Sequence, residues 1–189
     1  QGSISSIYYN NGLFIGKKNE IYRYNEQTGN FDLYYQLAGE NLEIFCMHQD
    51  KDNFWMGTTS NGVYCLNLTD KELTHPIQKG NITSIYQDSE GELWIGSWEE
   101  GLFLVKSNGE IINFKNKPGN PHSISSDFVR ACCEDNLGNI WIGTFNGLNR
   151  YNKSTGLFQN HTASDAQSDG LTHSSIWCIV KDNQGTLWL

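Results

Sequence analysis

The stretch GNIWIGTFNGLNRYNKSTGLF, from Gly138 to Phe158, decides the fold of this chain. In it a tryptophan stands between two isoleucines and is followed by a glycine, a short polar turn, a second glycine and another strand-like run. β-Branched and aromatic residues bounded by Gly, Asn and Ser are typical of strands joined by tight turns. The stretch therefore predicts paired strands, and neither catalysis nor metal binding requires its pattern.

The centre of this stretch, Ile-Trp-Ile-Gly at 140–143, occurs more than once. Related motifs stand at four other places: Leu-Trp-Ile-Gly at 93–96, Phe-Trp-Met-Gly at 54–57, Leu-Phe-Ile-Gly at 13–16, and the start of a fifth copy, Leu-Trp-Leu, at 187–189. The aromatic residues of successive copies are 41, 39, 47 and 47 residues apart. A period of this length is typical of repeat folds, and of the four-stranded blades of β-propellers in particular.

Each copy predicts one blade of four antiparallel strands. An inner strand precedes a polar turn, the tryptophan motif forms the second strand, and further turns lead to a third strand and a more polar outer strand, whose polarity protects an exposed edge. We therefore expect an all-β chain in which residues 1–189 form one partial β-propeller, an incomplete fragment of about four blades. The expected blades are residues 4–37, 42–78, 82–116 and 127–162, with a truncated fifth at 174–189.

The repeated aromatic residues are expected to be structural wedges between adjacent blades. They are Phe14, Trp55, Trp94, Trp141 and Trp188. Burying one such ring removes roughly 150–250 Å² from water, which stabilises each blade by several kcal/mol. A carbohydrate-stacking role is the alternative, but a residue that recurs in each blade favours the core.

Composition excludes several classes of function. A net charge of −8 and a pI near 5.0 argue against a non-specific nucleic-acid or anionic-membrane surface, so binding of a polyanion needs a local basic patch. No apolar run of about 18 residues is present, and no signal-peptide pattern opens the chain. The five cysteines form no CxxC pair, and the five histidines show no HxH or HExxH spacing, so we expect no metal and no cofactor.

A ligand site is expected where the blades differ, because propellers bind at loops carried on a repeated scaffold. Trp98 and Phe145 occupy equivalent turn positions, are aromatic and lie outside the repeated motif. The candidate ligand-binding residues are Trp98, Glu99, Phe145, Asn146, Asn61, Thr59, His122 and Arg130. The alternatives stay open at this point: the two aromatic residues pack against the next blade, and Arg130 either meets an anionic sugar or pairs with Asp127.

Two stretches carry a resemblance to a known family. They are DSEGELWIGSWEEGLF at 88–103 and DNLGNIWIGTFNGLNRY at 135–151. The pattern of Asp, turn glycine, Trp-Ile-Gly, Thr or Ser, and then Gly-Leu with an aromatic strand resembles the two-component regulator propeller repeat. Departures are Phe14 and Asn10 in the first copy and the missing turn glycine in the second, Lys51 to Asn53.

The resemblance implies a periplasmic sensor segment of a hybrid two-component system. It implies an oligosaccharide ligand that regulates glycan-utilisation genes, and a parent chain in which a transmembrane helix leads to a histidine kinase and a response regulator. The implied partners are the oligosaccharide, the remaining blades and domains of the parent and a second copy of the chain, with no nucleic acid bound by this segment and no catalytic residue in it.

Two other functions are weighed beside the sensor. A sialidase-like glycoside hydrolase or lyase is suggested by Asp88, Gly91 and Trp94, which are similar to a sialidase Asp box with one extra residue. Such enzymes cluster three arginines, whereas the three arginines here include Arg23 and Arg150 at equivalent scaffold positions. A protein-interaction propeller of the WD type is the other alternative, although its Trp-Asp and Gly-His signatures are missing.

Overall fold

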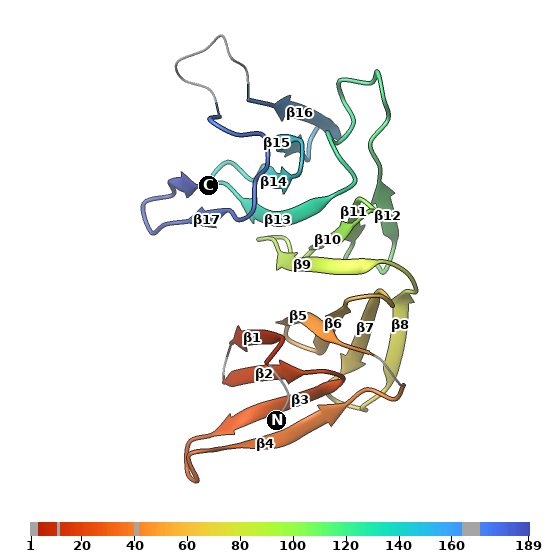
Figure 1. Cartoon of the computed structure of the whole chain (residues 1–189), viewed down its shortest axis with the longest axis vertical. Helices are drawn as coiled ribbons and strands as arrows, with labels where there is room; N and C mark the ends of the chain where they lie inside the picture. The colour runs from red at the N-terminus through yellow and green to blue at the C-terminus, as the bar shows by residue number, and fades with distance from the viewer. Residues whose placement is uncertain (1–3, 11, 40–41, 164–170) are drawn as a thin grey trace. The chain divides into compact units, whose positions relative to one another are not determined.

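The computed structural model describes residues 4–10, 12–39, 42–163 and 171–189 (Figure 1). The chain divides into two compact units, Gln1–Ile85 and Tyr86–Leu189, and each is described by itself. All of the regular elements in the described residues are strands, numbered β1 to β18. Within the same ranges, no helix has the length and apolar character needed to cross a membrane.

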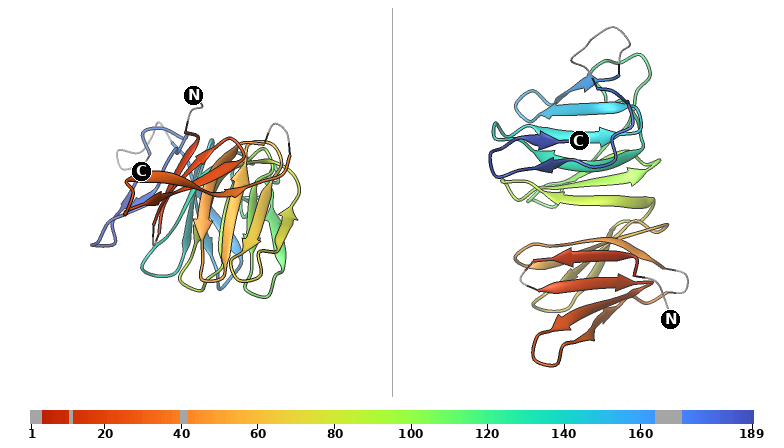
Figure 2. Two further views of the ribbon diagram at one scale, coloured as in Figure 1. Left: turned by 90° about the horizontal axis from the view of Figure 1, so that it is seen from below. Right: turned by 60° about the vertical axis from the view of Figure 1, so that its left-hand side comes forward.

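The first unit contains two four-stranded antiparallel sheets, in the orders β1-β2-β3-β4 and β5-β6-β7-β8. Blade 1 consists of β1 (Ser6–Tyr9), β2 (Leu13–Lys17), β3 (Glu20–Asn25) and β4 (Asn30–Gln36). Blade 2 consists of β5 (Ile44–Gln49), β6 (Asn53–Thr58), β7 (Val63–Asn67) and β8 (Leu73–Ile77). Consecutive strands are neighbours in each sheet, which is the meander of a propeller blade (Figure 2).

Two further four-stranded sheets follow, with orders β12-β11-β10-β9 and β13-β14-β15-β16. Blade 3 consists of β9 (Asn81–Gln87), in which the boundary between the units falls, β10 (Leu93–Trp98), β11 (Leu102–Val105) and β12 (Ile111–Phe114). Blade 4 consists of β13 (Val129–Glu134), β14 (Ile140–Thr144), β15 (Gly147–Asn152) and β16 (Leu157–His161). The partial blade 5 is the strand pair β17 (Val180–Lys181) and β18 (Leu187–Trp188). The predicted all-β chain of four-stranded antiparallel blades is confirmed.

The glycine of the tryptophan motif is a point of close approach between consecutive blades. A Cβ on Gly143 of blade 4 would lie 2.7 Å from Ile176 Cγ2 at the start of the next copy, and one on Gly57 would lie 2.6 Å from Ile82 Cγ2. The small residue of the inner strand, such as Cys46, lies directly opposite this glycine across the sheet. The glycine is therefore required because an isoleucine of the following copy occupies the space where a side chain would stand.

The acidic residue before the first turn holds both the turn and the tryptophan. In blade 3, Asp88 Oδ1 accepts hydrogen bonds from the backbone N–H groups of Glu90 (3.0 Å) and Glu92 (2.9 Å), while Oδ2 accepts one from Trp94 Nε1 at 2.8 Å. The other three complete pairs have the same indole bond: Trp55 with Asp50 at 2.7 Å, Trp141 with Asp135 at 2.8 Å, and Trp188 with Asp182 at 2.9 Å. One carboxylate thus fixes a tight turn and orients a wedge.

The repeated aromatic residues differ in burial. Phe14, Trp55 and Trp94 are 2%, 8% and 0% exposed. Trp141 is half-buried and stacks on His161, with ring centroids 5.7 Å apart. Trp188 is 63% exposed. The ring is therefore buried in blades 1 to 3 and most exposed in the partial blade 5, where the indole–carboxylate bond forms although the ring stays in solvent.

Candidate functional site

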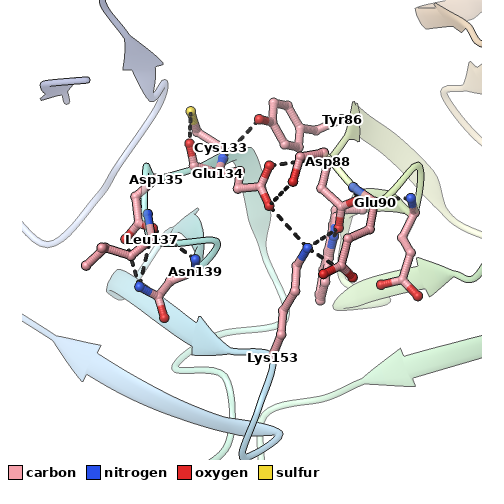
Figure 3. A network of polar contacts seen from close by, with 12 residues as sticks. Tyr86, Asp88, Glu90, Cys133, Glu134, Asp135, Leu137, Asn139 and Lys153 are labelled. Atoms are coloured by element: carbon pink, nitrogen blue, oxygen red, sulfur yellow. Dashed lines mark hydrogen bonds and ion pairs between the residues drawn. The ribbon is translucent and has the colours of Figure 1, made fainter. Parts of the chain in front are cut away.

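A buried ion network joins blades 3 and 4 (Figure 3). Lys153, just after β15, places its Nζ 2.8 Å from Asp88 Oδ2 and 3.2 Å from Glu134 Oε1, and these two carboxylate side chains are 0% and 7% exposed. Glu134 also accepts hydrogen bonds from the backbone N–H (2.8 Å) and hydroxyl (2.9 Å) of Ser89. Each buried charge of this network has partners of opposite charge or hydrogen-bond donors.

The pKa values of the network follow from these contacts. Burial raises the pKa of the Asp88 carboxyl, but hydrogen bonds from Lys153 and Trp94 outweigh it and bring the pKa below its ordinary value. For Lys153, burial lowers the pKa, and the hydrogen bonds to Asp88 and Glu134 raise it well above its ordinary value. The groups are thus stabilised in their charged forms, as expected of a structural ion network rather than of an acid or base that exchanges protons near neutral pH.

A second polar and aromatic group lies at the other ends of these strands. We call it the Arg130 cluster, and it consists of Trp98, Phe128, Arg130, Phe145 and Trp177. The Cζ of Arg130 lies 4.2 Å from the centroid of the Trp98 ring and 4.0 Å from that of Trp177, within the range of cation–π contacts. The guanidinium is therefore stacked between two indoles.

The phenylalanines complete the cluster on its Trp98 side. Trp98 contacts Phe128 edge-on at 5.2 Å between ring centroids and Phe145 at 5.8 Å. Phe145 in turn lies 6.4 Å from the Trp177 ring. Phe145 and Trp177 are 46% and 62% exposed, so the cluster presents aromatic surface to solvent.

The backbone of blade 4 explains how Arg130 reaches this place. Val129 pairs with Thr144 and Ala131 with Gly143, so Arg130 is the extra residue of a β-bulge. A bulge changes the direction of one side chain relative to the strand, and bulges are common beside functional sites. Blade 2 has the same bulge between Ile44 and Cys46, where Phe45 is 44% exposed.

The cluster is built from two positions of the repeat, each used twice. Trp98 is the last residue of β10 and Phe145 comes directly after β14, and both stand two residues after the glycine of the tryptophan motif. Arg130 and Trp177 each follow the β-branched residue that stands at the start of the inner strand segment in every copy, which is Val129 before Arg130 and Ile176 before Trp177. In blades 1 and 2 the Trp98 position is Lys18 and Thr59, and the Arg130 position is Ser5 and Phe45. The cluster is therefore specific to the second unit.

The other predicted site residues have separate places. Glu99 is exposed, has a φ of 89°, and its backbone oxygen accepts a hydrogen bond from Lys115 Nζ at 2.7 Å. Asn146, next to Phe145, is exposed and its amide nitrogen lies 3.4 Å from the Ser125 oxygen. His122 lies instead beside a shallow depression that Arg150 and Phe158 also line.

Two predicted site residues belong to the first unit. The amide of Asn61 donates to the Tyr64 hydroxyl at 2.5 Å, and its backbone oxygen is 2.6 Å from His75 Nε2. The His75 ring stacks on Tyr64 with centroids 4.0 Å apart. The backbone N–H of Thr59 donates to the Glu43 oxygen at 3.0 Å. These residues form a polar group of their own in blade 2.

Sequence reasoning missed Phe128 and Trp177 as members of the cluster. Trp177 had a signal, because it is the only tryptophan at its position among the five copies, just as Arg130 is the only arginine there. It also missed Lys153 and Glu134 as members of the ion network, because they stand 65 and 46 residues after Asp88 in the sequence. No spacing rule relates such distant residues without the blade alignment.

Comparison with known protein families agrees with this architecture. The model of the family described as two component regulator propeller matches residues 76–99, 123–146 and 170–189. Each segment ends in or just after the tryptophan motif, and the first two extend into the turn that follows it. No curated protein sequence matches this chain.

Solved structures show the propeller fold. The extracellular domain of a hybrid two-component system from B. thetaiotaomicron aligns with a TM-score of 0.65 and 21% identity over 98% of this chain and 31% of that chain. PorZ, a surface component of the type-IX secretion system of Porphyromonas gingivalis, aligns at 0.66 and 13% over 98% and 30%. The WD40 β-propeller domain of Doa1 aligns at 0.66 and 17% over 99% and 60%. This chain therefore spans about a third of the two-component structure.

Proposed function

Because the chain carries repeats of the two-component regulator propeller family, we propose that it is an extracytoplasmic sensing segment of a hybrid two-component system. In this proposal the segment lies in the periplasm and binds an oligosaccharide, and the parent chain contains a histidine kinase that regulates glycan-utilisation genes. The segment itself performs no catalysis. The solved two-component structure of similar fold is an extracellular domain, which supports the proposed location.

One observation carries the ligand assignment: aromatic rings gather at the variable positions of blades 3 to 5 and remain partly exposed. Phe145 and Trp177 are 46% and 62% exposed, and Trp98 contacts both Phe145 and the guanidinium of Arg130. Apolar faces of sugar rings pack on such surfaces, and neighbouring polar groups fix the orientation of the ligand. We propose that the Arg130 cluster is the oligosaccharide site.

A binding signal requires two states of the sensor. A ligand shifts an equilibrium only by its difference in affinity for the two states. The cluster joins three consecutive copies of the repeat, since Trp98 ends β10, Arg130 lies in β13 and Trp177 precedes β17. Ligand bound to these side chains therefore changes the relative stability of blade arrangements, and this is the route by which we propose that binding is transmitted.

The proposal is tested by calorimetric titration of the chain with a panel of plant, host and microbial oligosaccharides. We expect at least one to bind, and Trp98→Ala to weaken it about tenfold or more, as truncation of an aromatic anchor does. Phe31→Ala is the matched control, because this exposed aromatic residue lies in β4 of blade 1. Wild-type chain that binds no member of the panel, or equal losses in the two variants, would contradict the proposal.

A further inference from the structure

We propose that Arg130 binds the carboxylate of an acidic sugar, so that the ligand is an oligosaccharide containing a uronic acid. The inference rests on the proposed function, which assigns an oligosaccharide to the Arg130 cluster, and adds the chemical class of that oligosaccharide. Four observations support it: terminal guanidinium donors without an acceptor, two acids that pair with a lysine, two indoles that stack on the guanidinium, and a backbone bulge that places it.

The guanidinium of Arg130 has donors without acceptors. Throughout the described residues, no oxygen accepts a hydrogen bond from it, and its Nε is shielded from solvent. Shielded N–H groups are nearly always paired in folded proteins, because water no longer satisfies them and the loss of a partner is costly. The Nε of Arg150 is shielded and without an acceptor as well, but Arg150 Nη2 donates to Gln159, whereas neither Nη group of Arg130 has an acceptor among the described residues. We therefore assign the acceptor of the Arg130 Nη groups to a ligand.

Two acids near the cluster in the sequence, Asp127 beside Phe128 and Glu100 two residues after Trp98, are engaged with other groups. Asp127 Oδ1 accepts a hydrogen bond from the backbone N–H of Asn116 at 2.7 Å, and its Oδ2 lies 3.9 Å from Lys115 Nζ. Glu100 Oε2 lies 3.2 Å from the same ammonium group. Both acids thus face the Lys115 ammonium group, and among the described residues no carboxylate forms an ion pair with Arg130.

The two indoles define which part of Arg130 a ligand meets. Trp98 and Trp177 each stack on the guanidinium, with ring centroids 4.2 and 4.0 Å from Cζ, so a ligand meets it through its terminal Nη groups rather than through the shielded Nε. A carboxylate is planar and accepts two parallel hydrogen bonds from such groups. The partial burial of Arg130, which lowers its pKa, leaves it charged and strengthens its attraction for an anion.

The flanking aromatic surface suits the rest of a sugar ring. Trp177 is 62% exposed although it stacks on Arg130, so part of its indole is available beside the carboxylate position. An acidic sugar presents a carboxylate at one end of a ring with apolar C–H faces. The net charge of −8 provides no long-range attraction for such a ligand, so the affinity depends on this one local contact.

A purely structural role for Arg130 makes a different prediction. In that case the guanidinium only fills the space between two indoles, and removing its charge does not change the preference between acidic and neutral sugars. Arg150 offers a matched control, because its Cζ lies 6.0 Å from the Trp141 centroid and its Nη2 already donates to Gln159 at 2.7 Å. An effect specific to Arg130 therefore reports on the proposed carboxylate.

The experiment uses a panel of uronic-acid-containing oligosaccharides, each paired with its carboxyl-reduced, neutral product. Calorimetric titration of the wild-type chain should show at least one acid that binds about tenfold or more tightly than its neutral product. Arg130→Gln should remove this difference by weakening the acid about ten- to a hundredfold and leaving the neutral sugar within about threefold. Arg150→Gln should leave both affinities unchanged.

The outcomes separate this inference from the proposed function. Acids and neutral products that bind equally well would overturn the inference and leave oligosaccharide sensing in place. An acid preference that survives Arg130→Gln would also overturn it. If oligosaccharides of every class fail to bind the wild-type chain, the proposed function fails with it. Should Arg130→Gln unfold, Arg130→Lys decides, since it keeps the charge but loses the paired donors and should retain only part of the acid preference.

Discussion

Trp94 and Trp98 lie four residues apart at the two ends of strand β10, yet their surroundings differ completely. Trp94 is 0% exposed, and its indole donates to the carboxylate of Asp88. Trp98 is only partly buried and stacks on the guanidinium of Arg130, 4.2 Å from its ring centroid. The first residue belongs to the repeated scaffold and the second to the variable cluster. Residue type does not separate these roles, but position within the repeat does.

The physical basis of this difference is the space that each position must fill. The Trp94 ring packs on Tyr151 of the next blade, with ring centroids 5.2 Å apart, and the same ring recurs with the same carboxylate partner in blades 2 and 4. The Trp98 position faces solvent and side chains from the next copies, and it is Lys18 or Thr59 in the first two blades. Packing therefore constrains the residue at the Trp94 position, whereas the residue at the Trp98 position differs between the copies.

The largest test of this difference compares Trp94→Ala with Trp188→Ala. Both indoles donate to an aspartate, at 2.8 and 2.9 Å, but Trp188 is 63% exposed. We expect Trp94→Ala to lower the free energy of unfolding by about 3–5 kcal/mol, because it opens a cavity and removes a donor from a buried carboxylate. Trp188→Ala should cost less than about 1 kcal/mol.

Urea unfolding followed by circular dichroism measures both changes. Trp98→Ala belongs in the same series, and we expect its cost to be intermediate, about 1–2 kcal/mol, for the lost cation–π and ring contacts. Equal losses for Trp94 and Trp98 would show that the scaffold and the cluster are one packing unit, and the distinction between them would be wrong.

The second test breaks the ion network of Asp88, the residue that accepts the hydrogen bond of the Trp94 indole. Lys153→Met leaves the Asp88 and Glu134 carboxylates, 0% and 7% exposed, without their cation. Because an uncompensated buried charge is costly, we expect a loss of about 2–4 kcal/mol at neutral pH. The double variant with Asp88→Asn should lose less than the sum of the two single changes, and additive losses would contradict direct coupling of the pair.

The network also predicts the direction of acid destabilisation. The pKa of Asp88 is lower in the folded chain than its ordinary value of about 3.9, so its stabilisation is complete above that pH and is lost as the pH falls through the folded pKa. The raised pKa of Lys153 contributes below about pH 10.4 and is lost only at strongly alkaline pH. Melting temperatures of the wild type should therefore fall below about pH 4, and more steeply than those of Lys153→Met.

The blade architecture was predictable because the same sequence pattern recurs in each copy of the repeat. One Ile-Trp-Ile-Gly motif fits many folds, but recurrence of the motif with the same upstream aspartate and turn fixes strand order and period. From the sequence, the recurring glycine indicates only that the backbone has no room for a side chain at Gly143. The residue that takes up this space, Ile176 of the following copy, is known only from the structure. Periodic local features are thus visible in the sequence, and contacts between copies are visible only once they are aligned.

Blade 1 shows the limit of such prediction for burial. Ile4 and Ile7 carry the residue types of positions that are buried in later copies, where Ile44 and Met47 are 0% and 6% exposed. In blade 1 they are 55% and 70% exposed. The repeat specifies which side chains suit an interface between blades, whereas exposure depends on whether a neighbour covers that face.

The candidate site was predictable only in part. Trp98, Phe145 and Arg130 stood out because they break the repeat, and the structure brings these three together. His122 broke the repeat as well and lies beside a different depression. The bulge at Arg130 decides the outcome, because it re-aims one side chain toward two indoles, and a sequence does not show which residue of a strand bulges.

The smallest test asks whether the Arg130 cluster depends on the repeated scaffold at the contact between Gly143 and Ile176. Gly143 and Thr144 precede Phe145, and Ile176, which packs on Gly143, precedes Trp177. A methyl group at Gly143 would lie 2.7 Å from Ile176 Cγ2, so Gly143→Ala must displace the start of the last copy, at a cost of about 1–2 kcal/mol.

The displacement moves Trp177 away from Arg130, and tryptophan fluorescence should therefore change in Gly143→Ala. It should not change in Gly29→Ala, which is strained by its own φ of 71° but whose methyl group meets no atom within 4 Å. If the cluster is built on the scaffold as the contacts indicate, binding of the oligosaccharide weakens in Gly143→Ala although no cluster residue has changed. Unaltered fluorescence and binding, with lowered stability, would mean that the inner strands of blades 4 and 5 hold Arg130 and Trp177 together without the glycine contact.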